Sequence, residues 1–190
     1  MIVTVFAANL TTGVILPIVA VVALVAINGV FVAAEFSLVA SRRSRINALA
    51  TGGNRGARWL LGVFDRPTGK DSYIAVAQLG ITLASIGLGM YGEPAIAHWL
   101  YDPFESLGLS EGAAHTVGFV VALSIITYLH VVFGEMIPKA WALDTPEATS
   151  LRVNPVMRTF SILFRPAVAF LNWVALSLMR LLRIREPDKT

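Results

Sequence analysis

The sequence has 190 residues, of which 56% are apolar and only 14% are charged, and its mean hydropathy is +0.70. Soluble domains have about 45–50% apolar and about 25% charged residues, so this composition predicts a membrane protein and excludes a disordered chain. The chain has no cysteine, which excludes disulfides, thiolate metal sites and cysteine nucleophiles. The net charge is +3, and the positions of the charges indicate orientation in a membrane and not nucleic-acid binding.

Three stretches are apolar enough to cross a bilayer, whose hydrocarbon core of about 30 Å takes about 20 residues of helix. They run over residues 14–40, 73–90 and 113–137. We therefore expect an all-α membrane protein in which residues 1–144 form a bundle of three transmembrane helices.

The basic residues predict how these helices are oriented. All 15 Lys and Arg lie within residues 42–70 and 139–189. Since Lys and Arg collect in cytoplasmic loops, both regions are predicted to be cytoplasmic, where they contact lipid headgroups. The connection over residues 91–112 has acidic residues and no basic one, so we expect it outside. The N-terminus is then outside and the C-terminus inside, in a multi-pass protein of the plasma membrane.

Residues after the third span predict helices at the membrane surface. The apolar run 166–179 is short for a fourth span, and crossing would carry the basic tail outside. We expect a cytoplasmic juxtamembrane belt over residues 145–184, with a break at Arg165-Pro166 because proline disfavours helix in the preceding residue. Residues 185–190 are polar and are expected to be a linker to a cytoplasmic domain absent from this sequence.

The third span carries the strongest candidate for a functional group. An ionisable side chain in hydrocarbon costs about 2.5–3.5 kcal/mol, so Glu135 needs a reason to be there. Pro138 follows it and has no N–H, so the carbonyl of Gly134 loses its helical partner and needs another donor, a water or a cation. A broken helix that exposes a carbonyl beside a carboxylate is how transporters build cation sites.

Serine hydroxyls add to this candidate site. Ser85 belongs to a polar stripe on the second span, and Ser37 and Ser41 lie one helical turn apart at the inner end of the first. With Glu135 and the freed carbonyls they form an oxygen-only ligand set, which suits Mg²⁺, Ca²⁺ or Na⁺ better than Zn²⁺ or copper. The serines also fit a row of small residues that lets helices approach closely, and the sequence leaves both interpretations open.

Other polar residues have structural interpretations. His130 lies about 140° from Glu135 on an α-helix, so we expect it to pack between helices. Glu35 is close enough in sequence to Arg42 and Arg43 to form an ion pair at the membrane boundary. Asn28 lies on the opposite side of the first helix from the serines.

Three segments together resemble the transmembrane domain of the CNNM/CorC family of magnesium transporters. They are residues 28–38 (NGVFVAAEFSL), 78–95 (QLGITLASIGLGMYGEPA) and 130–139 (HVVFGEMIPK). The resemblance implies a homodimer with three spans, a short outer helix and a cytoplasmic juxtamembrane belt. It also implies Mg²⁺ efflux coupled to Na⁺ entry, with nucleotide-binding CBS modules after the membrane domain in the full-length chain. The ion site that it implies consists of Ser37, Ser41, Ser85 and Glu135, with Asn28 and the Gly134 carbonyl as further ligands.

The sequence suggests three functions that experiments can distinguish. The first is a Na⁺-coupled Mg²⁺ exporter that works by alternating access and is not an enzyme. The second is a Mg²⁺ sensor or scaffold that regulates another channel without transporting ions. The third is an intramembrane hydrolase that uses Ser124 or Ser85 with His130; the lack of a Gly-x-Ser-x-Gly motif disfavours it.

Overall fold

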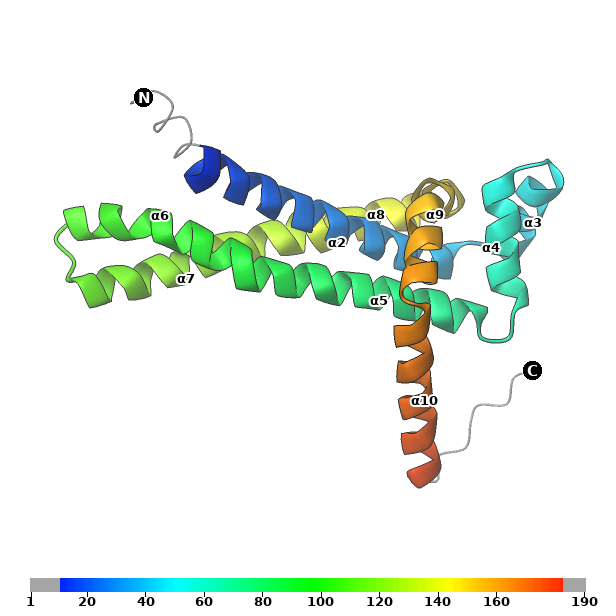
Figure 1. Cartoon of the computed structure of the whole chain (residues 1–190). Helices are drawn as coiled ribbons and strands as arrows, with labels where there is room; N and C mark the ends of the chain where they lie inside the picture. Colours follow the sequence, from blue (N-terminus) through cyan, green and yellow to red (C-terminus); the bar gives the residue numbers. More distant parts are fainter. Residues whose placement is uncertain (1–10, 183–190) are drawn as a thin grey trace. The chain divides into compact units, whose positions relative to one another are not determined.

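A computed structural model describes residues 11–182, which are almost entirely helical and contain no strand (Figure 1). The label η marks a π-helix, in which each carbonyl accepts from the N–H five residues on. The elements in chain order are η1 (Thr11–Ile15), α2 (Leu16–Ala40), α3 (Arg43–Thr51), α4 (Arg55–Asp65), α5 (Gly69–Gly87), η2 (Leu88–Gly92), α6 (Glu93–Ser106), α7 (Glu111–Leu129), η3 (His130–Met136), α8 (Ile137–Asp144), α9 (Pro146–Leu163) and α10 (Arg165–Leu181).

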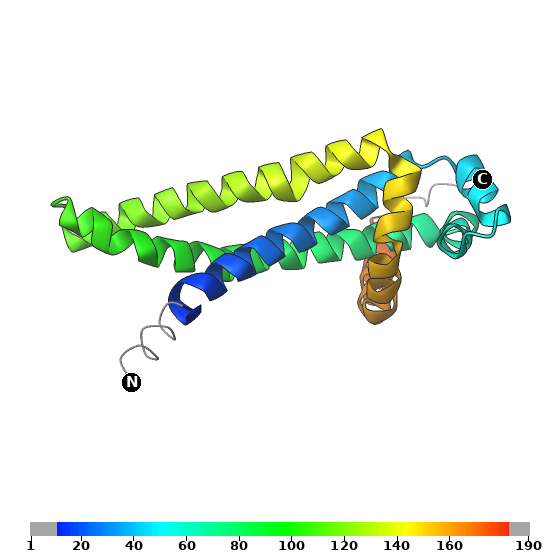
Figure 2. The same ribbon diagram turned by 90° about the horizontal axis from the view of Figure 1, so that it is seen from above.

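Three continuous helices are long and apolar enough to cross a membrane, which confirms the predicted fold class. They cover Gly13–Ala40, Gly69–Ser106 and Glu111–Asp144. The second is longer than its apolar stretch because the outer helix α6 continues α5 through η2. Gly108 ends α6 with a φ of 92°, which glycine adopts without strain, and α7 then returns alongside α6 (Figures 1 and 2).

A π-helical turn precedes a proline in each of the three long helices. The segments η1, η2 and η3 end two residues before Pro17, Pro94 and Pro138. Proline cannot donate to the carbonyl four residues back, and a π-turn before it moves the backbone pairing by one residue. In η3 the Ile137 N–H donates to the Val132 carbonyl, five residues back. The helix therefore shifts its register at Pro138 and continues into α8, where the sequence had predicted a break.

By its internal contacts the chain forms two compact units. The first contains the residues up to Val32 together with Gly80–Ala140. Apolar side chains from α2, η2 and α7 form its core, and glycines let the helices approach closely. A Cβ on Gly80 would overlap the ring of Phe31, which is buried. The core residues are Val21, Val25, Leu88 and Ile126.

The second unit contains Ala33–Leu79 and the residues from Trp141 on. Its loop after the first span is the helical pair α3 and α4, joined at Gly53, which has a φ of 94°. The helices α9 and α10 lie in the part of the sequence for which a juxtamembrane belt is predicted, and they meet at an angle of 68° where Arg165-Pro166 begins α10. The predicted linker 185–190 lies outside the described residues.

Candidate cation site

The first unit satisfies the carbonyl that Pro138 was predicted to free. The side-chain amide of Asn28 donates to the Gly134 carbonyl over 3.0 Å, and both residues are buried. Gly29 makes this possible, because a Cβ there would lie 2.9 Å from the Pro138 ring. Asn28 Oδ1 is buried and has no hydrogen-bond partner among the described residues. An unpaired buried oxygen is costly and is a candidate ligand for a cation.

Ser85, His130 and Glu135 come together in the same unit. Ser85 Oγ donates to the Ile81 carbonyl over 2.9 Å and lies 3.3 Å from His130 Nε2. The same nitrogen lies 3.8 Å from Glu135 Oε1. The His130 side chain is 18% exposed and that of Glu135 is 48% exposed. Glu135 is therefore accessible to an ion, and the more buried His130 side chain contacts it.

The expected orientation of His130 was wrong, and η3 explains why. In an α-helix, residues five apart point about 140° away from each other. In a π-helix the residue five positions on lies nearly above the first, because the hydrogen bonds have that spacing. His130 and Glu135 are the first and sixth residues of η3. An imidazole therefore lies beside the carboxylate of the candidate site, where the sequence predicted only oxygen-bearing groups.

The serine, histidine and glutamate do not have the geometry of a hydrolytic triad. A triad needs one imidazole nitrogen on the nucleophile and the other on the carboxylate. Here His130 Nε2 is the atom that contacts both Ser85 and Glu135. The other serine considered, Ser124, is exposed and donates to the Val120 carbonyl over 2.7 Å. The contacts favour a binding site over covalent chemistry.

Ser37 and Ser41 belong to the second unit, at the C-terminal end of α2. Both are buried, Ser37 Oγ donates to the Ala34 carbonyl over 3.2 Å, and Ser41 Oγ donates to the Ser37 carbonyl over 2.6 Å. Ser41 Oγ also lies 3.0 Å from Ser150 Oγ of α9. The C-terminal end of a helix carries partial negative charge, which favours a cation near these hydroxyls.

The boundary residues of the first span pair differently from the expectation. Glu35 accepts a hydrogen bond from Gln78 over 3.2 Å. Arg43 forms an ion pair with Asp65 of α4 at 2.6 Å. The helical pair α3 and α4 brings Asp65 to Arg43, and sequence spacing alone gives no sign of this.

No group of three or more His, Cys, Asp or Glu that could hold a metal ion occurs within residues 11–182. The candidate ligands predicted from the sequence are instead hydroxyl, amide and carbonyl oxygens together with the Glu135 carboxylate. Such a donor set suits a hard cation that keeps part of its water shell.

Comparison with known proteins identifies the family. The family model described as the Cyclin M transmembrane N-terminal domain matches residues 18–190. The chain belongs to this family. The family model describes a transmembrane domain, which agrees with the three candidate spans.

Several bacterial relatives share most of this Cyclin M domain. UPF0053 protein YhdT of Bacillus subtilis is 45% identical over 149 residues, which are 78% of this chain and 32% of the relative. UPF0053 protein YugS of the same species is 39% identical over 88% of this chain and 38% of its own length. Uncharacterized protein Rv1841c of Mycobacterium tuberculosis is 36% identical over 87% of this chain and 46% of its own length. The chain thus spans about a third to a half of the length of these relatives.

The contact between Asn28 and Gly134 can be tested by its effect on stability. Replacing Asn28 with leucine keeps the number and branching of the side-chain heavy atoms but leaves the Gly134 carbonyl without this donor in a buried place. We expect the free energy of unfolding to fall by about 1–3 kcal/mol, the cost of a buried polar group without a partner. Thermal unfolding in Mg²⁺-free detergent checks this, with the exposed Ser124→Ala as the control. Equal stability of the two variants would contradict the contact.

Proposed function

We propose that this Cyclin M domain transports Mg²⁺ across the plasma membrane, and that Asn28, Ser85, Gly134 and Glu135 bind the ion. The observation that carries the proposal is the buried Asn28 amide on the Gly134 carbonyl, one residue from Glu135 in a membrane-spanning helix. The resemblance to magnesium transporters agrees with this chemistry. Ser37 and Ser41 are further ligands that we propose from the sequence.

The geometry of the Asn28 amide suits an octahedral ion. Adjacent ligands around Mg²⁺, each about 2.1 Å from the metal, lie about 3.0 Å apart. The Asn28 amide nitrogen and the Gly134 carbonyl oxygen are 3.0 Å apart. A half-turn of the amide would put Oδ1, now unpaired, in place of the nitrogen. Both oxygens would then face the ion that replaces the hydrogen bond.

Weak binding suits a transporter of this kind. One carboxylate cannot neutralise a divalent ion, and Mg²⁺ gives up its water reluctantly. An ion held in this way enters and leaves readily, which transport by alternating access requires. We propose that the direction is export, that entry of Na⁺ drives it, and that two copies of the chain form a homodimer with the N-termini outside.

The longer relatives leave room for a cytoplasmic domain. About half or more of each relative's length lies outside the matched region. We propose that the full-length chain continues into a CBS-type domain that regulates the membrane domain.

Na⁺ coupling predicts uphill movement of Mg²⁺. A tenfold Na⁺ gradient supplies about 1.4 kcal/mol per ion, enough to hold a tenfold Mg²⁺ gradient for each coupled Na⁺. We expect proteoliposomes with equal Mg²⁺ on both sides to develop a Mg²⁺ gradient when a Na⁺ gradient is imposed. A Mg²⁺-sensitive dye inside the vesicles measures it, and a K⁺ gradient of the same size is the control.

The alternative, a sensor that regulates another channel, gives a different result in the same vesicles. It predicts that the purified protein binds Mg²⁺ but that the dye signal is the same as in protein-free vesicles under every gradient. Flux that runs only down the Mg²⁺ gradient would instead indicate a channel and would contradict coupling.

A further inference from the structure

One face of α9 contacts the segment that follows the first span. Glu147, Ser150 and Asn154 lie at positions i, i+3 and i+7, within about 60° of one another around the helix. Ser150 Oγ lies 3.0 Å from Ser41 Oγ, and the Asn154 amide donates to the Gly56 carbonyl over 2.8 Å. Ser150 and Asn154 are buried. These polar contacts fix the position of α9 along this segment.

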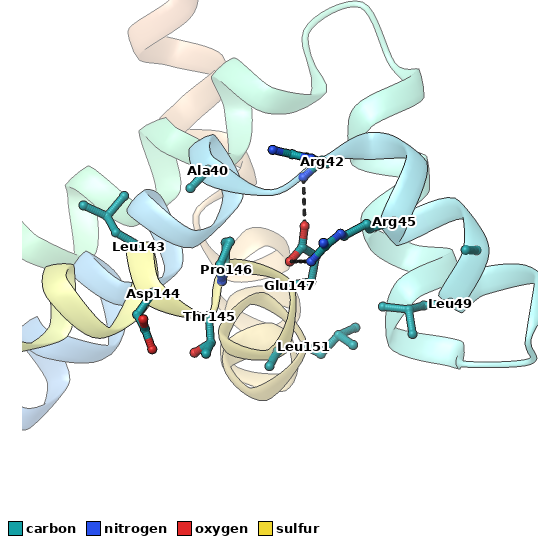
Figure 3. Close-up of a pocket in the computed structure, with 12 residues that line it drawn as sticks. Ala40, Arg42, Arg45, Leu49, Leu143, Asp144, Thr145, Pro146, Glu147 and Leu151 are labelled. Carbon is teal, nitrogen blue, oxygen red and sulfur yellow. Dashed lines mark hydrogen bonds and ion pairs between the residues drawn. The ribbon is translucent and has the colours of Figure 1, made fainter.

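Glu147 makes the third contact, at the start of α3 (Figure 3). Its Oε1 accepts from the Arg42 backbone N–H over 3.2 Å, and its Oε2 lies 3.7 Å from Arg45 Nη1. The side chain is only 13% exposed and lines a cavity of about 870 Å³ together with both arginines. A carboxylate at a helix N-terminus is favourable. The hydrogen bond from Arg42 to Glu147 therefore fixes the backbone directly after Ser41.

The hydrogen bonds around Ser41 determine which hydroxyl donates. A serine hydroxyl has one proton and two acceptor lone pairs. Ser41 gives its proton to the Ser37 carbonyl at 2.6 Å. Ser150 must then donate in the 3.0 Å contact between the two hydroxyls. This leaves one lone pair on Ser41, with its direction fixed by the two hydrogen bonds.

We propose that Ser150 is a positioning residue for cation binding, because its hydrogen bond leaves Ser41 a single free lone pair of fixed direction with which to bind a cation. The inference rests on the proposed function, in which Ser41 is a predicted ligand. It brings one side chain of α9 into the binding machinery, although nothing in the sequence of α9 suggested a ligand.

The test compares two variants that each remove one buried contact of α9. Ser150→Ala removes the hydrogen bond to Ser41, and Asn154→Ala removes the one to Gly56. We expect Ser150→Ala to raise the Mg²⁺ concentration for half-maximal flux and for half-maximal thermal stabilisation by about 3- to 10-fold, the value of one hydrogen bond. The maximal rate and the stability without Mg²⁺ should match those of Asn154→Ala, whose Mg²⁺ dependence should stay that of the wild type.

A double variant shows whether Ser150 acts through Ser41. Ser41→Ala/Ser150→Ala should need the same Mg²⁺ concentration as Ser41→Ala alone, since the second change removes a bond already lost. The proposal would be overturned if the shift in Mg²⁺ concentration in the double variant were the product of the two single shifts. It would also be overturned if Ser150→Ala and Asn154→Ala shifted the Mg²⁺ concentration equally. Ser150→Cys, whose thiol is a weaker donor, should give an intermediate shift and replaces Ser150→Ala should that variant not fold.

The outcomes also separate this inference from the proposed function. Loss of Mg²⁺ binding in Glu135→Gln with unchanged binding in Ser150→Ala would overturn the role of Ser150 alone. A wild-type protein that neither binds nor moves Mg²⁺ would overturn both.

Discussion

Replacing Glu135 with glutamine is expected to weaken Mg²⁺ binding about 100-fold or more and to abolish transport at millimolar Mg²⁺. Glutamine has the same shape but no charge, and Glu135 is the one carboxylate of the proposed site. Loss of about 3 kcal/mol of ion attraction in a partly dehydrated place corresponds to about 100-fold in affinity. Mg²⁺-dependent thermal stabilisation of the purified protein measures binding, and vesicle flux measures transport.

Two further variants control this prediction. Glu105→Gln removes an exposed carboxylate from α6 in the same unit, and we expect it to behave as the wild type. Glu135→Asp keeps the charge on a shorter side chain and should retain part of the affinity. Wild-type Mg²⁺ dependence in Glu135→Gln would rule out the proposed site, whatever the flux.

Replacing Gly80 with alanine is expected to lower the free energy of unfolding by about 1–3 kcal/mol, which is the usual cost of overpacking. The added Cβ would overlap three ring atoms of Phe31. That ring is 1% exposed and has little space to move, so the two helices must separate. Thermal unfolding in detergent, read by circular dichroism, measures the loss.

Gly89 provides a matched control nine residues along the same continuous helix. A Cβ on Gly89 meets nothing within 4 Å among the described residues. Gly89→Ala should therefore keep the wild-type stability or gain slightly, since alanine favours helix over glycine. Equal losses in the two variants would show that contact with Phe31 does not set the stability of the first unit.

The sequence predicted the fold well because the determinants are local. Runs of about 20 apolar residues specify spans, and Arg165-Pro166 specifies a helix boundary. The extent of the second and third helices was harder to predict, because η2 and η3 let them continue past Pro94 and Pro138. A proline predicts the loss of one hydrogen bond, but neighbouring packing decides whether a helix breaks or changes its register there.

The candidate site was predictable in its chemistry and less so in its geometry. Glu135 was identified because a carboxylate in hydrocarbon is costly, and the Gly134 carbonyl because proline lacks an N–H. The contact between His130 and Glu135 does not follow from the sequence, because α-helical geometry separates their directions and the π-helix η3 does not. Ser150 was missed because its partner Ser41 is 109 residues away in sequence, although the polar spacing at 147, 150 and 154 could have indicated a buried face.

The π-turns η2 and η3 have a consequence for the outer surface of the second and third spans. A π-turn adds one residue to a helical turn, which rotates everything beyond it by about 100° relative to an uninterrupted α-helix. A stripe of lipid-facing side chains that runs straight up to Leu88 or His130 therefore resumes on another side after Gly92 or Met136. Each such helix therefore presents different faces to the lipid before and after its π-turn. A substitution that is tolerated at a lipid-facing position before the turn need not be tolerated at the equivalent α-helical position after it.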